Sequence, residues 1–171
     1  MPRVVRCGLI QASNVLSPER AGLSEIRETM IAKHLRMIDE AREKGVQVLC
    51  LQRLSYGPYF ATEQDARWYK FTERVPEGPT VKLMQEQARR HRMVMVPPMY
   101  EEEATGVYYN TAAVLDADGT YLGKYRKNHI PHCHPGFWEK FYFKWQFYRD
   151  RRPETYGASV GTCCRVHGEE H

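Results

Sequence analysis

The chain has 171 residues and a mean hydropathy of -0.63, with 42% hydrophobic and 27% charged side chains. This length suits one compact domain and excludes two domains of ordinary size. No run approaches the ~18 consecutive apolar residues of a membrane-spanning helix, and residues 1–11 lack the apolar stretch of a secretory signal. We therefore expect a cytoplasmic protein with no membrane partner.

Charge and cysteine content exclude two further classes of protein. The net charge of +4 comes from 25 basic and 21 acidic side chains, and the two signs are interspersed, which is typical of a solvated surface rather than a nucleic-acid-binding one. The five cysteines are sparse and odd in number: Cys7, Cys50, Cys133, Cys163 and Cys164. They indicate a reducing compartment rather than a disulfide framework, and two of them lie in apolar runs that predict buried thiols.

The first part of the chain predicts a strand, a helix and a second strand. Residues 4–11 (VVRCGLIQ) are apolar and β-branched, which is typical of a central strand covered on both faces. Residues 24–44 place apolar side chains at steps of three and four, the period of a helix, which then ends at Gly45. Residues 46–52 (VQVLCLQ) predict a second buried strand, and this order favours parallel pairing through a right-handed crossover.

A second helix and three more strands are expected after a long loop. Residues 81–92 predict the helix, and residues 93–96 predict a strand that ends at a Pro-Pro pair. The runs 108–115 and 120–126 flank the sequence Asp-Ala-Asp-Gly and predict a hairpin, because Asp-Gly tolerates the positive φ of its turn. The element order indicates an α/β layered domain.

Two segments are expected to lie outside these elements. The acidic triplet at 101–103 has the composition of a solvated loop. From residue 145 onward no helical or strand period is present, so residues 144–171 are predicted to be a divergent or foreign tail, disordered or poorly patterned, after a first unit of residues 1–143.

Five segments carry a resemblance to a known family: residues 4–14, 45–60, 74–80 (RVPEGPT), 108–131 (YYNTAAVLDADGTYLGKYRKNHIP) and 135–143 (PGFWEKFYF). Their order and spacing resemble the carbon-nitrogen hydrolase (nitrilase) superfamily, closest to its N-carbamoyl amidohydrolase branch. The resemblance implies an α-β-β-α sandwich of which this chain supplies the first half, and a homo-oligomer. It stops at Phe143, so the sequence predicts a truncated hydrolase with a foreign tail.

The family uses a Cys nucleophile, a Glu general base, a Lys that stabilises the tetrahedral intermediate and often a second Glu. Lys127 matches the family lysine, and a cationic donor at a strand end can pair with an oxyanion. Glu139 matches the second glutamate, and its aromatic neighbours predict a desolvated carboxyl with a raised pKa. From the residues alone, both side chains also fit exposed charges at the surface.

Two positions depart from the family pattern. Arg53 stands where the family has its general base, and a guanidinium does not give up its proton at physiological pH. The spacing to the nucleophile leads to Cys163 and Cys164, but the preceding residues are poor in large apolar side chains. Both cysteines are therefore doubtful nucleophiles, and their match to the spacing is interpreted as a coincidence.

The resemblance also implies a substrate pocket. It places Tyr56, Tyr59 and Phe60 along the pocket, whereas the residues alone fit equally well as hydrophobic anchors of a loop. Asn110 and His129 lie within the longest matching segment and are expected to bind substrate.

Two alternative sites are less well supported by the sequence. His129, His132, Cys133 and His134 are all potential zinc ligands, but their spacing is not that of a zinc finger, so we expect no metal. The aromatic and arginine residues after Lys144 are nearly balanced by acidic ones, so we expect no nucleic-acid partner.

By resemblance, the reaction is hydrolysis of a carbon-nitrogen bond in a small N-carbamoyl or amide compound. A thiolate would attack the carbon, ammonia would leave, and water would hydrolyse the acyl-enzyme without a cofactor. Because of Arg53 and the missing nucleophile strand, we expect this chain to be impaired. The alternative is a non-catalytic subunit that associates with an intact homologue.

Overall fold

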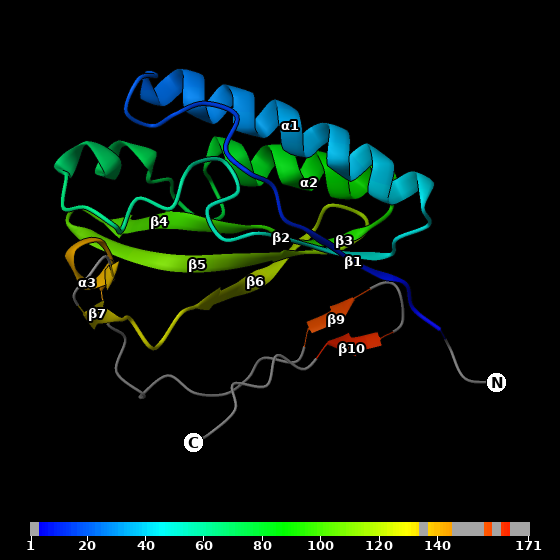
Figure 1. Ribbon diagram of the computed structural model, residues 1–171. Helices are drawn as coiled ribbons and strands as arrows, with labels where there is room; N and C mark the ends of the chain where they lie inside the picture. Colours follow the sequence, from blue (N-terminus) through cyan, green and yellow to red (C-terminus); the bar gives the residue numbers. More distant parts are fainter. Residues whose placement is uncertain (1–3, 134–136, 145–155, 159–161, 165–171) are drawn as a thin grey trace.

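The computed structural model describes residues 4–133, 137–144, 156–158 and 162–164 (Figure 1). The main sheet has six strands: β1 (Cys7–Ile10), β2 (Val48–Leu51), β3 (Val94–Val96), β4 (Pro98–Ala104), β5 (Val107–Leu115) and β6 (Tyr121–Arg126). The helices are α1 (Leu23–Glu43), the 3-10 helix η1 (Ala66–Phe71), α2 (Pro79–His91) and α3 (Glu139–Tyr142). Two small sheets pair β7 (His132–Cys133) with β8 (Phe137–Trp138) and β9 (Tyr156–Ala158) with β10 (Thr162–Cys164).

The sheet combines parallel and antiparallel pairing. Strands β1, β2 and β3 are parallel, and α1 connects β1 to β2 as the periodicity predicted. Strand β5 is antiparallel to β3, β4 and β6. Thr111 pairs with Met99 of β4 and with Arg126 of β6, so these two strands flank β5. It follows that β6 runs in the same direction as β2, and their carboxyl ends lie at the same edge of the sheet.

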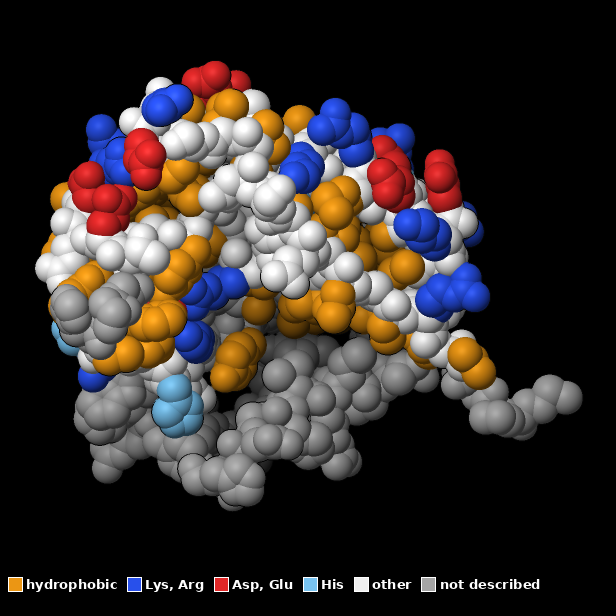
Figure 2. All heavy atoms as spheres, in the orientation of Figure 1, with side chains coloured by type: hydrophobic (Ala, Val, Ile, Leu, Met, Phe, Trp, Pro, Cys, Tyr) orange, Lys and Arg blue, Asp and Glu red, His pale blue; other side chains and the backbone are white. Residues whose placement is uncertain are grey.

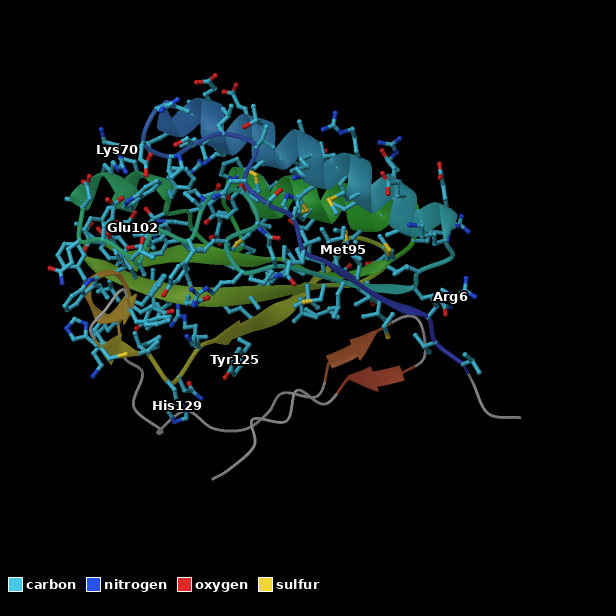
Figure 3. All side chains as sticks on the ribbon, viewed as in Figure 1. Arg6, Lys70, Met95, Glu102, Tyr125 and His129 are labelled. Atoms are coloured by element: carbon cyan, nitrogen blue, oxygen red, sulfur yellow. The ribbon has the colours of Figure 1, made fainter. Side chains whose placement is uncertain are left out.

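Helices α1 and α2 cover one face of the sheet (Figure 1). The buried residues of α1 recur every three or four positions, as predicted, and are Ile26, Met30, His34, Ile38 and Ala41. Met95 of β3 is fully buried on the helix side, and Figure 3 shows it between sheet and helices. Burying each large apolar side chain contributes about 1.5–3 kcal/mol, so this interface contributes substantially to stability.

The predicted hairpin is confirmed, and it is anchored on α2. Strands β5 and β6 flank the turn at 116–119, where Gly119 has a φ of 87°. The carbonyl of Gly119 accepts a hydrogen bond from Gln85 at 2.9 Å, and that of Asp118 accepts one from Arg89 at 2.9 Å. A Cβ at Gly119 would lie 2.6 Å from the carbonyl oxygen of Gln85, so only glycine fits this contact.

The prediction of a doubly covered central strand at 4–11 is wrong for the described residues. Strand β1 pairs only with β2 in the described sheet, and Leu9 is 85% exposed. The face of β1 opposite the helices has no cover there, and Cys7 is exposed rather than buried. An apolar strand sequence does not show whether one face of the strand or both faces are covered.

The acidic triplet is part of a strand, which corrects the predicted loop. Glu101 lies in β4 and is 1% exposed. It forms ion pairs with Lys124 at 2.5 Å and with Arg126 at 2.7 Å, and it accepts a hydrogen bond from Thr111 at 2.6 Å. This network joins β4, β5 and β6 on the face that carries Met99 and the helices.

The sequence also missed structure in the tail. Strands β9 and β10 form an antiparallel pair in which Cys163 lies opposite Gly157 and Cys164 opposite Tyr156. Strands as short as these carry little periodicity, so their residue pattern does not predict them.

Candidate active site

The central feature of the site is a buried carboxylate held by two cations. The side chain of Glu139 is 2% exposed. Its Oε2 lies 2.8 Å from Nζ of Lys127, and its Oε1 lies 2.5 Å from Nη1 of Arg53. The hydroxyl of Tyr59 donates to Oε1 at 3.1 Å. The structure therefore brings Lys127, Glu139, Arg53 and Tyr59 together from three separate segments.

The sheet topology explains why these residues meet. Arg53 follows β2 and Lys127 follows β6, and these strands end at the same sheet edge. Glu139 is the first residue of α3, which brings it against the same edge. The backbone N–H of Lys127 donates to the carbonyl of Asn110 at 2.8 Å, which extends the β5–β6 pairing by one residue and fixes the lysine.

The pKa of Glu139 is lowered, which contradicts the expectation from its aromatic neighbours. Burial does raise the pKa of this carboxyl, but the hydrogen bonds from Lys127 and Arg53 lower it by more, and their charges add to the effect. The carboxylate is thus ionised at neutral pH.

Two contacts fix the orientation of the Arg53 side chain. Its guanidinium carbon lies 4.3 Å from the centroid of the Tyr59 ring, while Nη1 is bound to Glu139. Burial raises the pKa of Tyr59, and the neighbouring Glu139 charge acts in the same direction. The phenol is therefore a hydrogen-bond donor at neutral pH. Tyr59 and Arg53 both donate to Oε1 of Glu139.

Asn110 lies beside Lys127 and is buried. It is 6% exposed, and its Nδ2 has no hydrogen-bond partner among the described residues. His129 is exposed, and Figure 3 shows it, like Tyr125, on the side of the sheet away from α1 and α2. Asn110 therefore lies at the site, whereas no contact of His129 with Glu139 is seen.

Tyr56 and Phe60 lie in the core, where they anchor the loop. The hydroxyl of Tyr56 donates to the carbonyl of Phe71 at 3.2 Å and accepts from the N–H of Tyr100 at 2.7 Å. Phe60 is 2% exposed and packs against Trp68 and Tyr100 with centroid distances of 5.4 and 5.3 Å. These packing contacts agree with the loop-anchor interpretation and place Tyr59 toward Glu139.

The doubtful nucleophiles have no established relation to this site. Cys163 and Cys164 lie in β10, and their side chains are outside the described residues. Among the described cysteines, Cys50 of β2 is half-buried, and burial raises the pKa of its thiol. A raised pKa disfavours the thiolate, so Cys50 is poorly suited to act as a nucleophile.

The described part of the chain contains no cluster of three or more potential metal ligands. His134 of the histidine-rich segment lies outside the described residues. Within the described ranges, no helix combines the length and apolarity needed to cross a bilayer.

A sequence model of the carbon-nitrogen hydrolase family matches residues 8–166. The chain belongs to the carbon-nitrogen hydrolase family. The match extends past Phe143, where the resemblance noted from the sequence stops. The fold agrees, because a carbon-nitrogen hydrolase from Helicobacter pylori superposes with a TM-score of 0.76 at 27% identity, over 91% of this chain and 49% of that one.

Two curated members of the carbon-nitrogen hydrolase family are similar over most of this chain. A beta-ureidopropionase from Arabidopsis thaliana is 40% identical over 76% of this chain and 32% of its own length. An N-carbamoylputrescine amidase from the same plant is 39% identical over 75% of this chain and 42% of its own length. The chain therefore spans less than half the length of either relative.

Proposed function

We propose that this carbon-nitrogen hydrolase chain carries part of a site for a small N-carbamoyl or amide compound, and that the chain alone is catalytically impaired. The observation that carries the proposal is the shared contact of Lys127 and Arg53 with Glu139. Lys127 supplies a fixed cationic donor of the kind that stabilises an oxyanion when a carbonyl becomes tetrahedral. Glu139 holds that donor in place.

Impairment follows from the chemistry of Arg53. A general base must accept a proton, and a guanidinium that is ion-paired to Glu139 has no lone pair for one. Loss of general acid-base help lowers a rate by about 10²–10⁴. Cys50, the described thiol of β2 that lies three positions before Arg53 in the sequence, has a raised pKa. These two features support a chain that binds its ligand but turns it over slowly or not at all.

The test is ammonia release by the purified chain from N-carbamoyl-β-alanine and N-carbamoylputrescine. We expect no release above a control without protein, while a full-length beta-ureidopropionase serves as the positive control. Arg53→Glu alone should restore nothing. The proposal would be contradicted by turnover that is lost in Lys127→Ala but kept in Lys82→Ala, which changes an exposed position on α2. Rescue by Arg53→Glu that depends on Cys163 or Cys164 would identify the nucleophile.

A non-catalytic role beside an intact homologue is the second candidate, and Arg53 together with the exposed face of β1 favours it. In that case the chain should co-purify with a full-length family member when the two are expressed together. Homo-oligomerisation and a cytoplasmic location also remain predictions.

A further inference from the structure

The site has more positive than negative charge. Arg53 and Lys127 share the single carboxylate of Glu139, and within the described ranges no other carboxylate lies within 4.0 Å of either cation. Their side chains are 31% and 33% exposed, whereas Glu139 is 2% exposed. Figure 2 shows basic side chains gathered among hydrophobic ones near β5 and β6, with no acidic side chain visible beside them. The excess charge therefore faces outward from a buried anchor.

Arg53 keeps donors available for a ligand. Only its Nη1 is bound to Glu139, and stacking on Tyr59 holds the plane of the guanidinium. A guanidinium has five N–H donors in a fixed fork that matches the two oxygens of a carboxylate. Because one side of this fork is already anchored, little side-chain entropy is lost when the remaining donors bind an anion.

Asn110 supplies an independent observation. It lies directly opposite Lys127 across the β5–β6 pair, so the two side chains share a face of the sheet. Its buried Nδ2 lacks an acceptor among the described residues. A buried amide N–H without an acceptor destabilises the fold. A ligand oxygen at this point would remove that destabilisation.

We propose that Arg53, Lys127 and Asn110 form a binding site for the carboxylate of a small molecule, with Arg53 setting a preference for acidic over neutral and basic carbamoyl compounds. The carbamoyl part rests on the proposed function, whereas the carboxylate part rests only on these three side chains. A ligand with an ammonium group is repelled by both cations. The site thus favours an N-carbamoyl acid over an N-carbamoyl amine.

The experiment is isothermal titration of the full chain at low salt with four small ligands. These are N-carbamoyl-β-alanine (acid), propylurea (neutral), N-carbamoylputrescine (amine) and propionate (acid without a carbamoyl group). The acid should bind at least about tenfold more tightly than propylurea, because hydrogen bonds to a charged group are about twice as strong as those between neutral groups. The amine should bind more weakly than propylurea.

Substitutions of Arg53 test its part in the preference for the acid. Arg53→Gln should reduce the preference for the acid over propylurea to about threefold or less, while Arg53→Lys, which keeps the charge but not the fork, should keep part of it. Arg67→Gln is the matched control. Arg67 is 34% exposed and stacked on Trp68 at 4.5 Å, but it contacts two carboxylates. Circular dichroism checks that each variant is folded.

The outcomes separate this proposal from the proposed function. Equal affinity of the wild-type chain for the acid and for propylurea, or an unchanged preference in folded Arg53→Gln, overturns the carboxylate site even if carbamoyl binding persists. Absence of binding by both acids overturns it as well. Propionate binding that needs Arg53, without any gain from a carbamoyl group, supports the carboxylate site and counts against the proposed function.

Discussion

Glu139 is the residue on which the site depends. It accepts hydrogen bonds from Lys127, Arg53 and Tyr59, and it is almost completely buried. Its lowered pKa shows that ion pairing outweighs the cost of burial. A carboxylate in this state orients donors rather than exchanging protons.

Glu139→Gln should lower the free energy of unfolding by about 1–3 kcal/mol at pH 7. The amide leaves two neighbouring cations without their shared counter-charge, although partial exposure to solvent reduces the cost. Because the folded-state pKa lies below the usual 4.5, the stabilisation by Glu139 is present above about pH 4.5 and is lost as the pH falls further.

Urea denaturation of both proteins at pH 7 and pH 3.5 measures this effect. The difference between wild type and variant should shrink at the lower pH. A difference that stays constant would mean that the charge of Glu139 is not its source. Arg53→Met in the Glu139→Gln background should recover part of the loss at pH 7, because it removes one of the two unbalanced charges.

The sequence indicated individual residues of the candidate site but not the contacts between them. Lys127 and Glu139 were identified by motif, and desolvation of Glu139 was anticipated correctly. Its ion pair with Arg53 joins residues 86 positions apart, and nothing local in either segment indicates such a contact. The direction of the pKa shift was therefore predicted wrongly.

At the scale of the elements, β4 is a strand of the main sheet that the sequence did not predict. The preceding strand, β3, does end before the Pro-Pro pair, as predicted. Pro98 nevertheless begins β4, because the first position of a strand tolerates a missing N–H. The acidic triplet looked like a loop because its charges are balanced by Lys124 and Arg126 on another strand. The helix stripe and the hairpin turn, by contrast, are local patterns and were predicted correctly.

Glu101→Gln should cost about 2–4 kcal/mol of stability, because it leaves Lys124 without its carboxylate and Arg126 with Glu103 as its remaining ion-pair partner. Glu102→Gln, in the next position of β4, is the control. Among the described residues, the side chain of Glu102 has one long hydrogen bond, from Thr72 at 3.4 Å, and its loss should cost less than about 1 kcal/mol. Equal unfolding midpoints in urea for the two variants would contradict the assigned role of Glu101.

At the scale of the whole molecule, the described fold is two layers, with one face of the sheet against α1 and α2 (Figure 1). On the opposite face Leu9 is 85% exposed and Tyr125 41% exposed. By the strand register both side chains project from that same face. Apolar side chains gathered on one open face are typical of an interaction surface.

The purified chain should therefore self-associate in a concentration-dependent way, and Leu9→Lys should shift it toward the monomer. Size-exclusion chromatography with light scattering measures the mass at several concentrations. Val15→Lys is the control, since Val15 is 45% exposed but lies outside the sheet. A monomer at all concentrations, or an equal effect of both variants, would count against association through this face.

The register of β6 against β5 also separates two groups of charges. Lys124 and Arg126 bind Glu101 on the helix side, whereas Lys127, one position later, binds Glu139 at the site. Since side chains alternate between faces, a shift of β6 by one residue against β5 would exchange the two sets of partners. A shift by two residues would preserve the sides. The register of β6, rather than its composition alone, thus keeps the structural and site charges apart.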